Sequence, residues 1–354
     1  NVSVGNQALF STNTGATNTA VGAAAARSNT TGSNNVAIGD SALYANNQSD
    51  ITAVGTKALR NNNSTWNTAI GAYALYKNTS GFTNTAVGYK SMEENVDGYR
   101  NTVVGANTLD NNISGDQNAG LGYYALSNNT LGNTNTAIGA YAMRLNTTSS
   151  QNTAVGHEAL YSQSYNNSGA VFNGNNTAIG FQALYTNNPT STSDGVRNVG
   201  VGHQSLLSNS TGYGNTSLGH QSSYQNTTGF YNVAVGDVAL FANTTGAYNV
   251  AIGAAAAYSN TTGRFNIAIG LDAMRLQSFN NGNAAWNSHN TAIGYRAMYN
   301  NQPTTTGNGV QNVALGNYAM EDNTIGFYNS AVGYGALADN IDGYSNTAMG
   351  TSAL

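Results

Sequence analysis

Three observations predict an all-β fold, a parallel β-solenoid (β-roll) of about twenty 17-residue coils. The motif N-x-A-h-G, in which h is an apolar residue, recurs along the whole chain, mostly at intervals of seventeen residues. Glycine holds the fifth place of all twenty units, and the fourth place is always apolar. Seventeen residues are too few for a helix-turn-helix repeat, which needs about 30 or more. Each unit is therefore expected to form one coil of a solenoid.

The commonest form of the unit is N-x-A-h-G-x-x-A-L-x-x-N-x-x-G-x-x, and asparagine holds the first place in every unit except at Ile51. The array is predicted to run without interruption over residues 1–354. The units begin at residues 1, 18, 35, 51, 67, 84, 101, 118, 135, 152, 176, 198, 215, 232, 249, 266, 290, 312, 329 and 346.

The first element of each unit is a short strand over its first five residues. Neighbouring side chains of a strand point to opposite faces. We expect the large fourth-place residue (Val4, Ile70, Val87 and equivalents) to fill the inside of the coil. The small third-place alanine and the glycine would then lie where another backbone approaches closely.

The second element is a short x-x-A-L strand, in which Leu9, Leu75 or Met143 completes the interior. The N-x-T-G stretch that follows is predicted to turn the chain, with its glycine supplying a positive φ. Apolar burial within one such coil is smaller than the entropy lost on ordering it, so burial between chains, against the small-residue side, would help. The predicted partner is therefore the chain itself, as a homotrimer or an end-to-end filament.

Composition excludes several classes of function. The chain has 354 residues, a net charge of -4 and no cysteine. Its eleven basic residues are scattered singly, so we expect no nucleic-acid partner. No apolar run approaches 18 residues, so no membrane insertion is expected in this segment. No catalytic residue, metal site or cofactor is predicted, and the chain is expected to be a segment of a longer one.

Several runs of the sequence resemble the head repeats of trimeric autotransporter adhesins: "NTAVGYKSM", "NTAIGAYALYKNTSGFTNTAVG" and "NVAIGAAAAYSNTTGRFNIAIG". They resemble still more the N-T-A-[VI]-G-x-x-A-L-x-x-N-T-T-G arrays of bacterial and phage tail-fibre-like proteins. The resemblance implies a left-handed, trimeric β-roll displayed outside a cell or virion. These units are longer than typical adhesin-head repeats, and the segment lacks the adhesins' membrane anchor and the tail fibres' self-cleaving chaperone.

Four stretches depart from the period and are predicted to be extended loops, at 162–175, 186–197, 276–289 and 300–311. The first and third match each other across 114 residues, as do the second and fourth, which indicates duplication of a block of coils. One interpretation is an aromatic ledge that binds a surface glycan or a receptor, formed by Tyr165, Phe172, Phe279 and Trp286. The other is a flap whose aromatic side chains fold back over the roll.

Several polar positions allow two interpretations. Seven turn asparagines begin N-x-S/T sequons and are candidate glycosylation sites on exposed turns, unless they are only turn formers: Asn29, Asn78, Asn146, Asn209, Asn226, Asn243 and Asn260. His157, His203 and His220 share the sixth place, and His203 and His220 would stack in adjacent coils. They could hold a metal or anion, or be ordinary packed histidines.

The leading functional hypothesis is a non-catalytic extracellular fibre segment, a rigid rod with surface loops for attachment. The alternative is a self-assembling, glycosylated filament built end to end. A third hypothesis is ice binding through second-place threonines, although that ladder is broken by residues such as Val36, Val199 and Val233.

Overall fold

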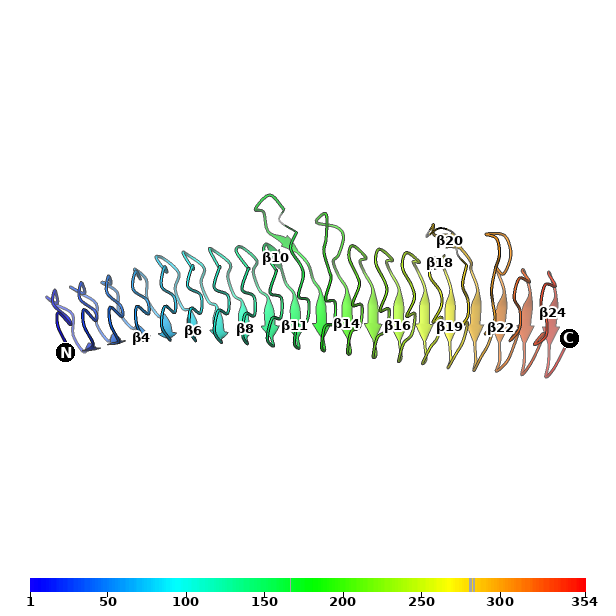
Figure 1. The fold of residues 1–354 in the computed structure, drawn as a ribbon, viewed down its shortest axis with the longest axis horizontal. Coiled ribbons are helices and arrows are strands. Elements are labelled where there is room, and N and C mark those ends of the chain that lie inside the picture. Colours follow the sequence, from blue (N-terminus) through cyan, green and yellow to red (C-terminus); the bar gives the residue numbers. More distant parts are fainter. Residues whose placement is uncertain (166, 280–281, 283) are drawn as a thin grey trace. The chain divides into compact units, whose positions relative to one another are not determined.

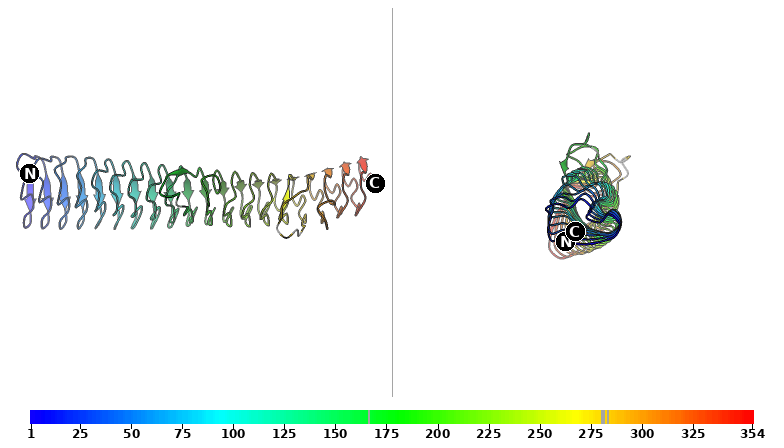
Figure 2. Two further views of the ribbon diagram at one scale, coloured as in Figure 1. Left: turned by 90° about the horizontal axis from the view of Figure 1, so that it is seen from above. Right: turned by 90° about the vertical axis from the view of Figure 1, so that its left-hand side faces the viewer.

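The computed structural model describes residues 1–354 except 166, 280–281 and 283, and it consists of two compact units, Asn1–Asn175 and Asn176–Leu354 (Figure 1). Each unit is a parallel β-solenoid, which confirms the predicted fold class. Every coil contributes one three-residue strand. The left panel of Figure 2 shows the strands of each unit lying side by side. No helix occurs among the described residues, and none of them forms an apolar helix that could cross a membrane.

The described residues of the first unit form ten three-residue strands: β1 (Val2–Val4), β2 (Thr19–Val21), β3 (Val36–Ile38), β4 (Thr52–Val54), β5 (Thr68–Ile70), β6 (Thr85–Val87), β7 (Thr102–Val104), β8 (Ala119–Leu121), β9 (Thr136–Ile138) and β11 (Thr153–Val155).

The described residues of the second unit also form ten: β13 (Thr177–Ile179), β14 (Val199–Val201), β15 (Thr216–Leu218), β16 (Val233–Val235), β17 (Val250–Ile252), β19 (Ile267–Ile269), β21 (Thr291–Ile293), β22 (Val313–Leu315), β23 (Ser330–Val332) and β24 (Thr347–Met349). Within each unit successive strands pair in register, so that second, third and fourth places meet their equivalents, as in Val250↔Ile267.

The strands turn the opposite way from the prediction. The third-place residue points inward and the large fourth-place residue points outward: Ala69 is fully buried, whereas Ile70 is 41% exposed. The prediction that Val4, Ile70 and Val87 fill the coil is therefore wrong. The leucine of the ninth place, such as Leu75, is fully buried and fills the interior as predicted. Because that leucine takes the volume, the strand opposite has room for little more than a methyl group.

The x-x-A-L segment is not a strand. It runs through successive turns, with the seventh and ninth residues in the left-handed region, as at Tyr73 (φ 61°) and Leu75 (φ 50°). This backbone bonds in both directions along the stack. The Tyr73 N–H donates to the carbonyl of Thr56 in the preceding coil (2.9 Å), and the Leu75 N–H donates to Ser91 in the following coil (3.0 Å). The hydrogen bonds between coils thus offset the cost of left-handed residues.

Two ladders of buried asparagines complete the interior. In the first-place ladder, the Oδ1 atom of Asn67 accepts from the backbone N–H of Asn84 in the next coil (2.9 Å). In the twelfth-place ladder, the Nδ2 atom of Asn95 donates to Oδ1 of Asn78 in the preceding coil (2.7 Å). Both Asn67 and Asn78 also donate to the carbonyl of Gly81 in their own coil (2.8 Å each). Each coil therefore has a polar half beside its alanine and leucine half.

The two recurrent glycines have different roles. Gly71, in the fifth place, has φ 138°, and a Cβ atom there would lie 2.3 Å from the carbonyl oxygen of Gly88. Gly81, in the turn, has no positive φ, so the prediction that it supplies one is wrong. Its Cβ would instead lie 2.4 Å from Asn78 Oδ1, so close packing of the asparagine ladder requires glycine there.

Candidate functional site

The long loops 162–175 and 276–289 fold alike, although residues 166, 280–281 and 283 lie outside the described residues. Each returns through a short strand that pairs with the coil before it. In the first unit, β10 (Ser149–Ser150) pairs in parallel with β12 (Phe172–Asn173). In the second, β18 (Gly263–Arg264) pairs with β20 (Trp286–Asn287). These short pairs lie at the edge of each unit away from the three-residue strands (Figure 1).

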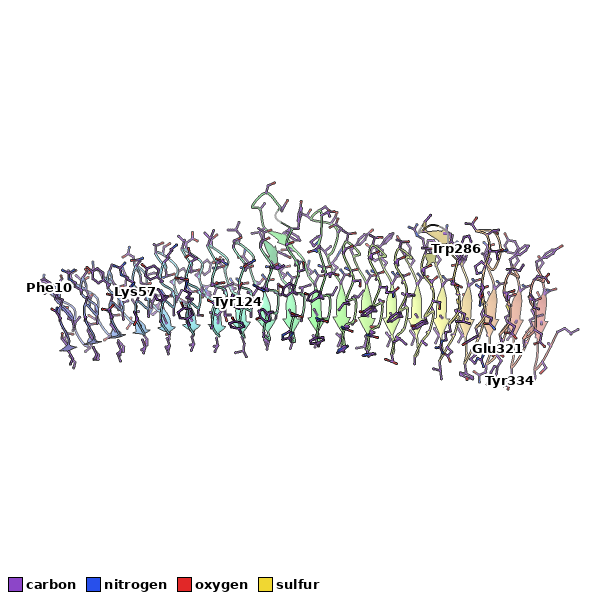
Figure 3. All side chains as sticks on the ribbon, viewed as in Figure 1. Phe10, Lys57, Tyr124, Trp286, Glu321 and Tyr334 are labelled. Carbon is purple, nitrogen blue, oxygen red and sulfur yellow. The ribbon has the colours of Figure 1, made fainter. Side chains whose placement is uncertain are left out.

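The four aromatic residues of the predicted ledge form two edge-on pairs. Tyr165 and Phe172 have ring centroids 5.6 Å apart, and Phe279 and Trp286 have centroids 5.5 Å apart. Phe172 and Trp286 are only 6% and 5% exposed, and Figure 3 labels Trp286 on the loop edge of the second unit. Two of the four rings are thus buried and present no broad face to a ligand. Binding at these residues stays a prediction.

Two glutamines that sequence reasoning missed hold the wider coils together. Gln163 and Gln277 occupy the twelfth place of the two 24-residue units, where asparagine is usual, and both are fully buried. The Gln277 Nε2 atom donates to Asn260 Oδ1 (3.2 Å), and its Oε1 accepts from Asn301 (3.0 Å). At Gln277 the longer side chain therefore continues the ladder through the enlarged coil. Gln163 instead donates to Ser149 Oγ (2.6 Å), and Asn146 Oδ1 in the preceding coil has no hydrogen-bond partner. Glutamine at the twelfth place marks both enlarged coils in the sequence.

The loops 186–197 and 300–311 share a second loop conformation. Pro189 and Pro303 are buried, and a carboxylate or amide closes each loop. Asp194 Oδ1 accepts from the N–H groups of Thr190 (2.8 Å) and Ser191 (3.1 Å), and Asn308 binds the equivalent N–H groups. The loop tips carry exposed hydroxyl and backbone groups that a partner could reach.

The seven sequon asparagines do not lie on exposed turns, so that part of the prediction is wrong. All are twelfth-place ladder residues with at most 2% exposure. The Nδ2 atom of Asn226, for example, donates to Asn209 Oδ1 (2.8 Å) and to the carbonyl of Gly229 (3.0 Å). A glycan is attached at this nitrogen, so its addition to the folded coil would break both hydrogen bonds. The glycosylation prediction depended on exposed acceptor asparagines, and these asparagines are buried.

The histidines occupy exposed columns. His203 and His220 stack with centroids 5.3 Å apart, as predicted, and His220 Nδ1 lies 2.9 Å from Asp237 Oδ1. His157 contacts Tyr141 edge-on at 5.8 Å between ring centroids. No group of three or more potential metal ligands occurs among the described residues. The column is a stack of neighbouring side chains on the surface of consecutive coils.

Asp110 is the one carboxylate whose pKa is displaced far among the described residues. Burial raises its pKa to about 6, and the charge of Glu93 in the preceding coil adds to the effect. Its Oδ1 atom is buried without a hydrogen-bond partner. Glu93 itself pairs with Lys90 (3.1 Å). The charge of Asp110 therefore changes with pH near its raised pKa of about 6.

A cavity of about 650 Å³ lies at the end of the second unit and is lined by Tyr318, Glu321, Tyr334 and Leu337 among others. Glu321 and Tyr334 are labelled there in Figure 3. The carboxylate of Glu321 is held by Arg296 at 3.0 Å. That ion pair ties the acid to the preceding coil.

A further surface feature of each unit is the outward face, which we define as the second- and fourth-place residues of the three-residue strands. Threonine or valine usually holds the second place, and valine, isoleucine, leucine or methionine holds the fourth. Leu121 and Leu218, for example, are 49% and 48% exposed. The sequence prediction missed this face because it placed the fourth-place residues inside. The chain matches no known family model and no curated protein.

Proposed function

We propose that the chain is a rigid structural segment of an extracellular fibre, non-catalytic, with attachment through its inserted loops. The observation that supports this most is the pair of buried asparagine ladders. They connect consecutive coils through side chains in addition to the backbone, as in Asn112 Nδ2 to Asn95 Oδ1 (2.7 Å) and Asn129 Nδ2 to Asn112 Oδ1 (3.2 Å). Stacked units of this kind gain stability from their neighbours and so favour length.

Small-angle scattering of the full chain tests the rod. Twenty coils at about 4.8 Å each predict a maximum dimension of about 95 Å for a straight stack. Asn112→Ala with Asn129→Ala removes two consecutive asparagines of the twelfth-place ladder. This double variant should shorten or broaden the distribution of interatomic distances obtained from the scattering. The matched control is Asn111→Ala with Asn128→Ala, which removes side chains at the two preceding eleventh places. A compact particle for the wild-type chain would reject the rod.

Attachment is assigned to the exposed tips of loops 186–197 and 300–311. Replacing Thr190–Ser193 and the equivalent Thr304–Gly307 by alanine and glycine should abolish binding to the glycan or receptor that retains the wild-type chain on a glycan array or cell surface. Unchanged retention by this variant would separate attachment from the loops and leave the rod proposal standing.

Ice binding is a second candidate, because four consecutive strands present threonine in register on the outward face. Thr52, Thr68, Thr85 and Thr102 form this run. Their hydroxyl and methyl groups, beside the fourth-place aliphatic groups, form a regular array that could order water. Thermal hysteresis that disappears in Thr68→Lys with Thr85→Lys would support this candidate, and no hysteresis in the wild-type chain would dismiss it.

A further inference from the structure

The outward face combines a fourth-place row of aliphatic side chains with a second-place row of mostly threonine and valine. None of its forty residues is charged. In the second unit the fourth-place side chains include Ile179, Leu218 and Ile252, which are 40%, 48% and 38% exposed. A repeated row of exposed aliphatic side chains is uncommon on a protein that stays alone in water.

The fold itself does not need these large side chains. The interior is closed by third- and eighth-place alanines and by the ninth-place leucine, as with Ala234, Ala239 and Leu240, which are all fully buried. Threonine or serine in the fourth place would preserve a strand at lower cost in exposed apolar area. Yet a valine, isoleucine, leucine or methionine stands there in all twenty coils. Contacts outside the coil would account for these large fourth-place side chains.

The face is also open and regular. The inserted loops leave each unit at the edge away from the strands (Figure 1). The nearest charged positions along the chain are the sixth place, as at Asp40 and Asp237, and the place before the first, as at Asp50 and Arg197. In-register pairing repeats the same pair of outward side chains at every strand, as between β16 and β17. A surface with this repeat is complementary to another surface with the same repeat.

The face of a single unit approaches the area of a specific interface. Ten strands at about 4.8 Å and three residues at about 3.3 Å give a face of about 480 Å² in each unit. Covering the face of one unit would bury about 960 Å² in total over the two partners. Specific interfaces bury about 1,200–2,000 Å².

We propose that the outward face is the surface through which copies of this chain associate side by side, a second copy being its occupant. The aliphatic groups of one copy pack between those of the other at each coil. This goes beyond the rod function, since a single chain could serve as a rod, and it assigns association to the residues that point out of the strand. The small third-place residues, which the sequence had suggested for this role, are buried inside each coil.

The experiment measures mass by sedimentation velocity and mass photometry on the full chain. We expect the wild-type chain to sediment at a multiple of its 36.5 kDa monomer mass. Leu218→Asp with Ile252→Asp should shift it to the monomer, because two copies would bury unpaired carboxylates. Leu218→Thr with Ile252→Thr, which keeps strand-forming residues, should weaken association at least tenfold and covers the case in which the aspartate variant misfolds.

The matched control is Gln225→Asp with Thr228→Asp, which adds the same charge at exposed positions of a turn. It should associate like the wild-type chain. A wild-type chain that is monomeric at about 10 µM overturns the proposal, and monomers that produce thermal hysteresis assign the face to ice instead. Association that survives both face variants equally overturns it too. Scattering from the monomeric variant still reports whether the single chain is a rod, so the two proposals can fail separately.

Discussion

The inward and outward sides of the same three-residue strand follow opposite rules. On the inward side the residue is alanine in most coils, and Ala251 lies fully buried between Ala234 and Ala268 in register. On the outward side its neighbour Ile252 is 38% exposed. A strand usually buries its larger side chains, and here it buries the smallest. The comparison teaches that the opposite wall, with its buried leucine and asparagines, decides how much room the strand receives.

The exceptions support this rule. Val103 is the one inward valine among these strands, and the next strand has glycine, Gly120, at the same place. A Cβ atom on Gly120 would lie 3.1 Å from Val103 Cγ1 and 2.8 Å from Thr108 Cγ2. The extra methyl groups of one coil thus occupy the space left by the next.

The largest expected effect comes from enlarging the inward side. Ala251→Leu should lower the free energy of unfolding by about 3 kcal/mol, because three further carbon atoms must enter a filled coil. Guanidinium unfolding followed by circular dichroism measures it. A loss below about 1 kcal/mol would mean that the coil can widen and that alanine is not imposed by volume.

The next effect comes from the polar half of the interior. Asn112→Ala should cost about 2 kcal/mol, because the Gly115 carbonyl and the Nδ2 group of Asn129 each lose a partner. Its exposed neighbour supplies the control, and Asn111→Ala should change stability by no more than about 0.5 kcal/mol. Equal effects of the two substitutions would show that the buried ladder adds nothing beyond an exposed contact.

Removing the charge of Asp110 should stabilise the chain at neutral pH. The folded pKa of about 6 lies above the ordinary aspartate value of 3.8, so the folded state holds the proton more tightly and stability falls as pH rises from about 4 to 6. Asp110→Asn should therefore gain about 1 kcal/mol at pH 7, discounted for partial exposure, and nothing below about pH 4. Unfolding curves at several pH values measure this. A gain that does not change with pH would contradict the assignment to ionisation.

A comparable gain in stability is expected in the turns of the x-x-A-L segment. Val238, a β-branched residue, has φ 47°. Asparagine tolerates this left-handed region better, so Val238→Asn should add about 1 kcal/mol to the free energy of unfolding. The melting temperature should rise accordingly, and a decrease would indicate that the valine side chain makes contacts worth more than the backbone strain.

The smallest effect on stability is expected on the outward side of the strand. Ile252→Thr should change the stability of the isolated chain by no more than about 0.5 kcal/mol, because the side chain already faces out of the coil. It should be measured on dilute chain, where association does not contribute. A loss near that of Ala251→Leu would erase the distinction between the two sides.

The sequence was sufficient to predict the solenoid, its period and the buried ninth-place leucine, because those follow from repetition and from the length of the unit. The orientation of the strand could not be predicted from it. A strand with alanine on one side and valine on the other allows both orientations, and hydrophobicity alone favoured the wrong one. The deciding facts are the left-handed turns at residues such as Tyr73 and the buried amides such as Asn78, which in most coils leave room for little more than alanine.

The candidate sites were predicted less well for a related reason. An N-T-T-G stretch is compatible with an exposed turn and with a buried ladder, and only packing separates the two. The two stated interpretations of the loop aromatics were a binding ledge and a flap folded back over the roll, and neither predicted that they pair edge-on within each loop. The outward face was missed as a consequence of the reversed strand.

The twelfth-place ladder gives each unit an electrical direction. Its amides donate from a later coil to an earlier one, as in Asn243 Nδ2 to Asn226 Oδ1 and Asn226 Nδ2 to Asn209 Oδ1. Amide dipoles aligned head to tail add up, as the peptide dipoles of a helix do. The coil nearest the amino terminus therefore presents the positive end of the column and the last coil the negative end, which makes the two ends of a stack chemically unequal.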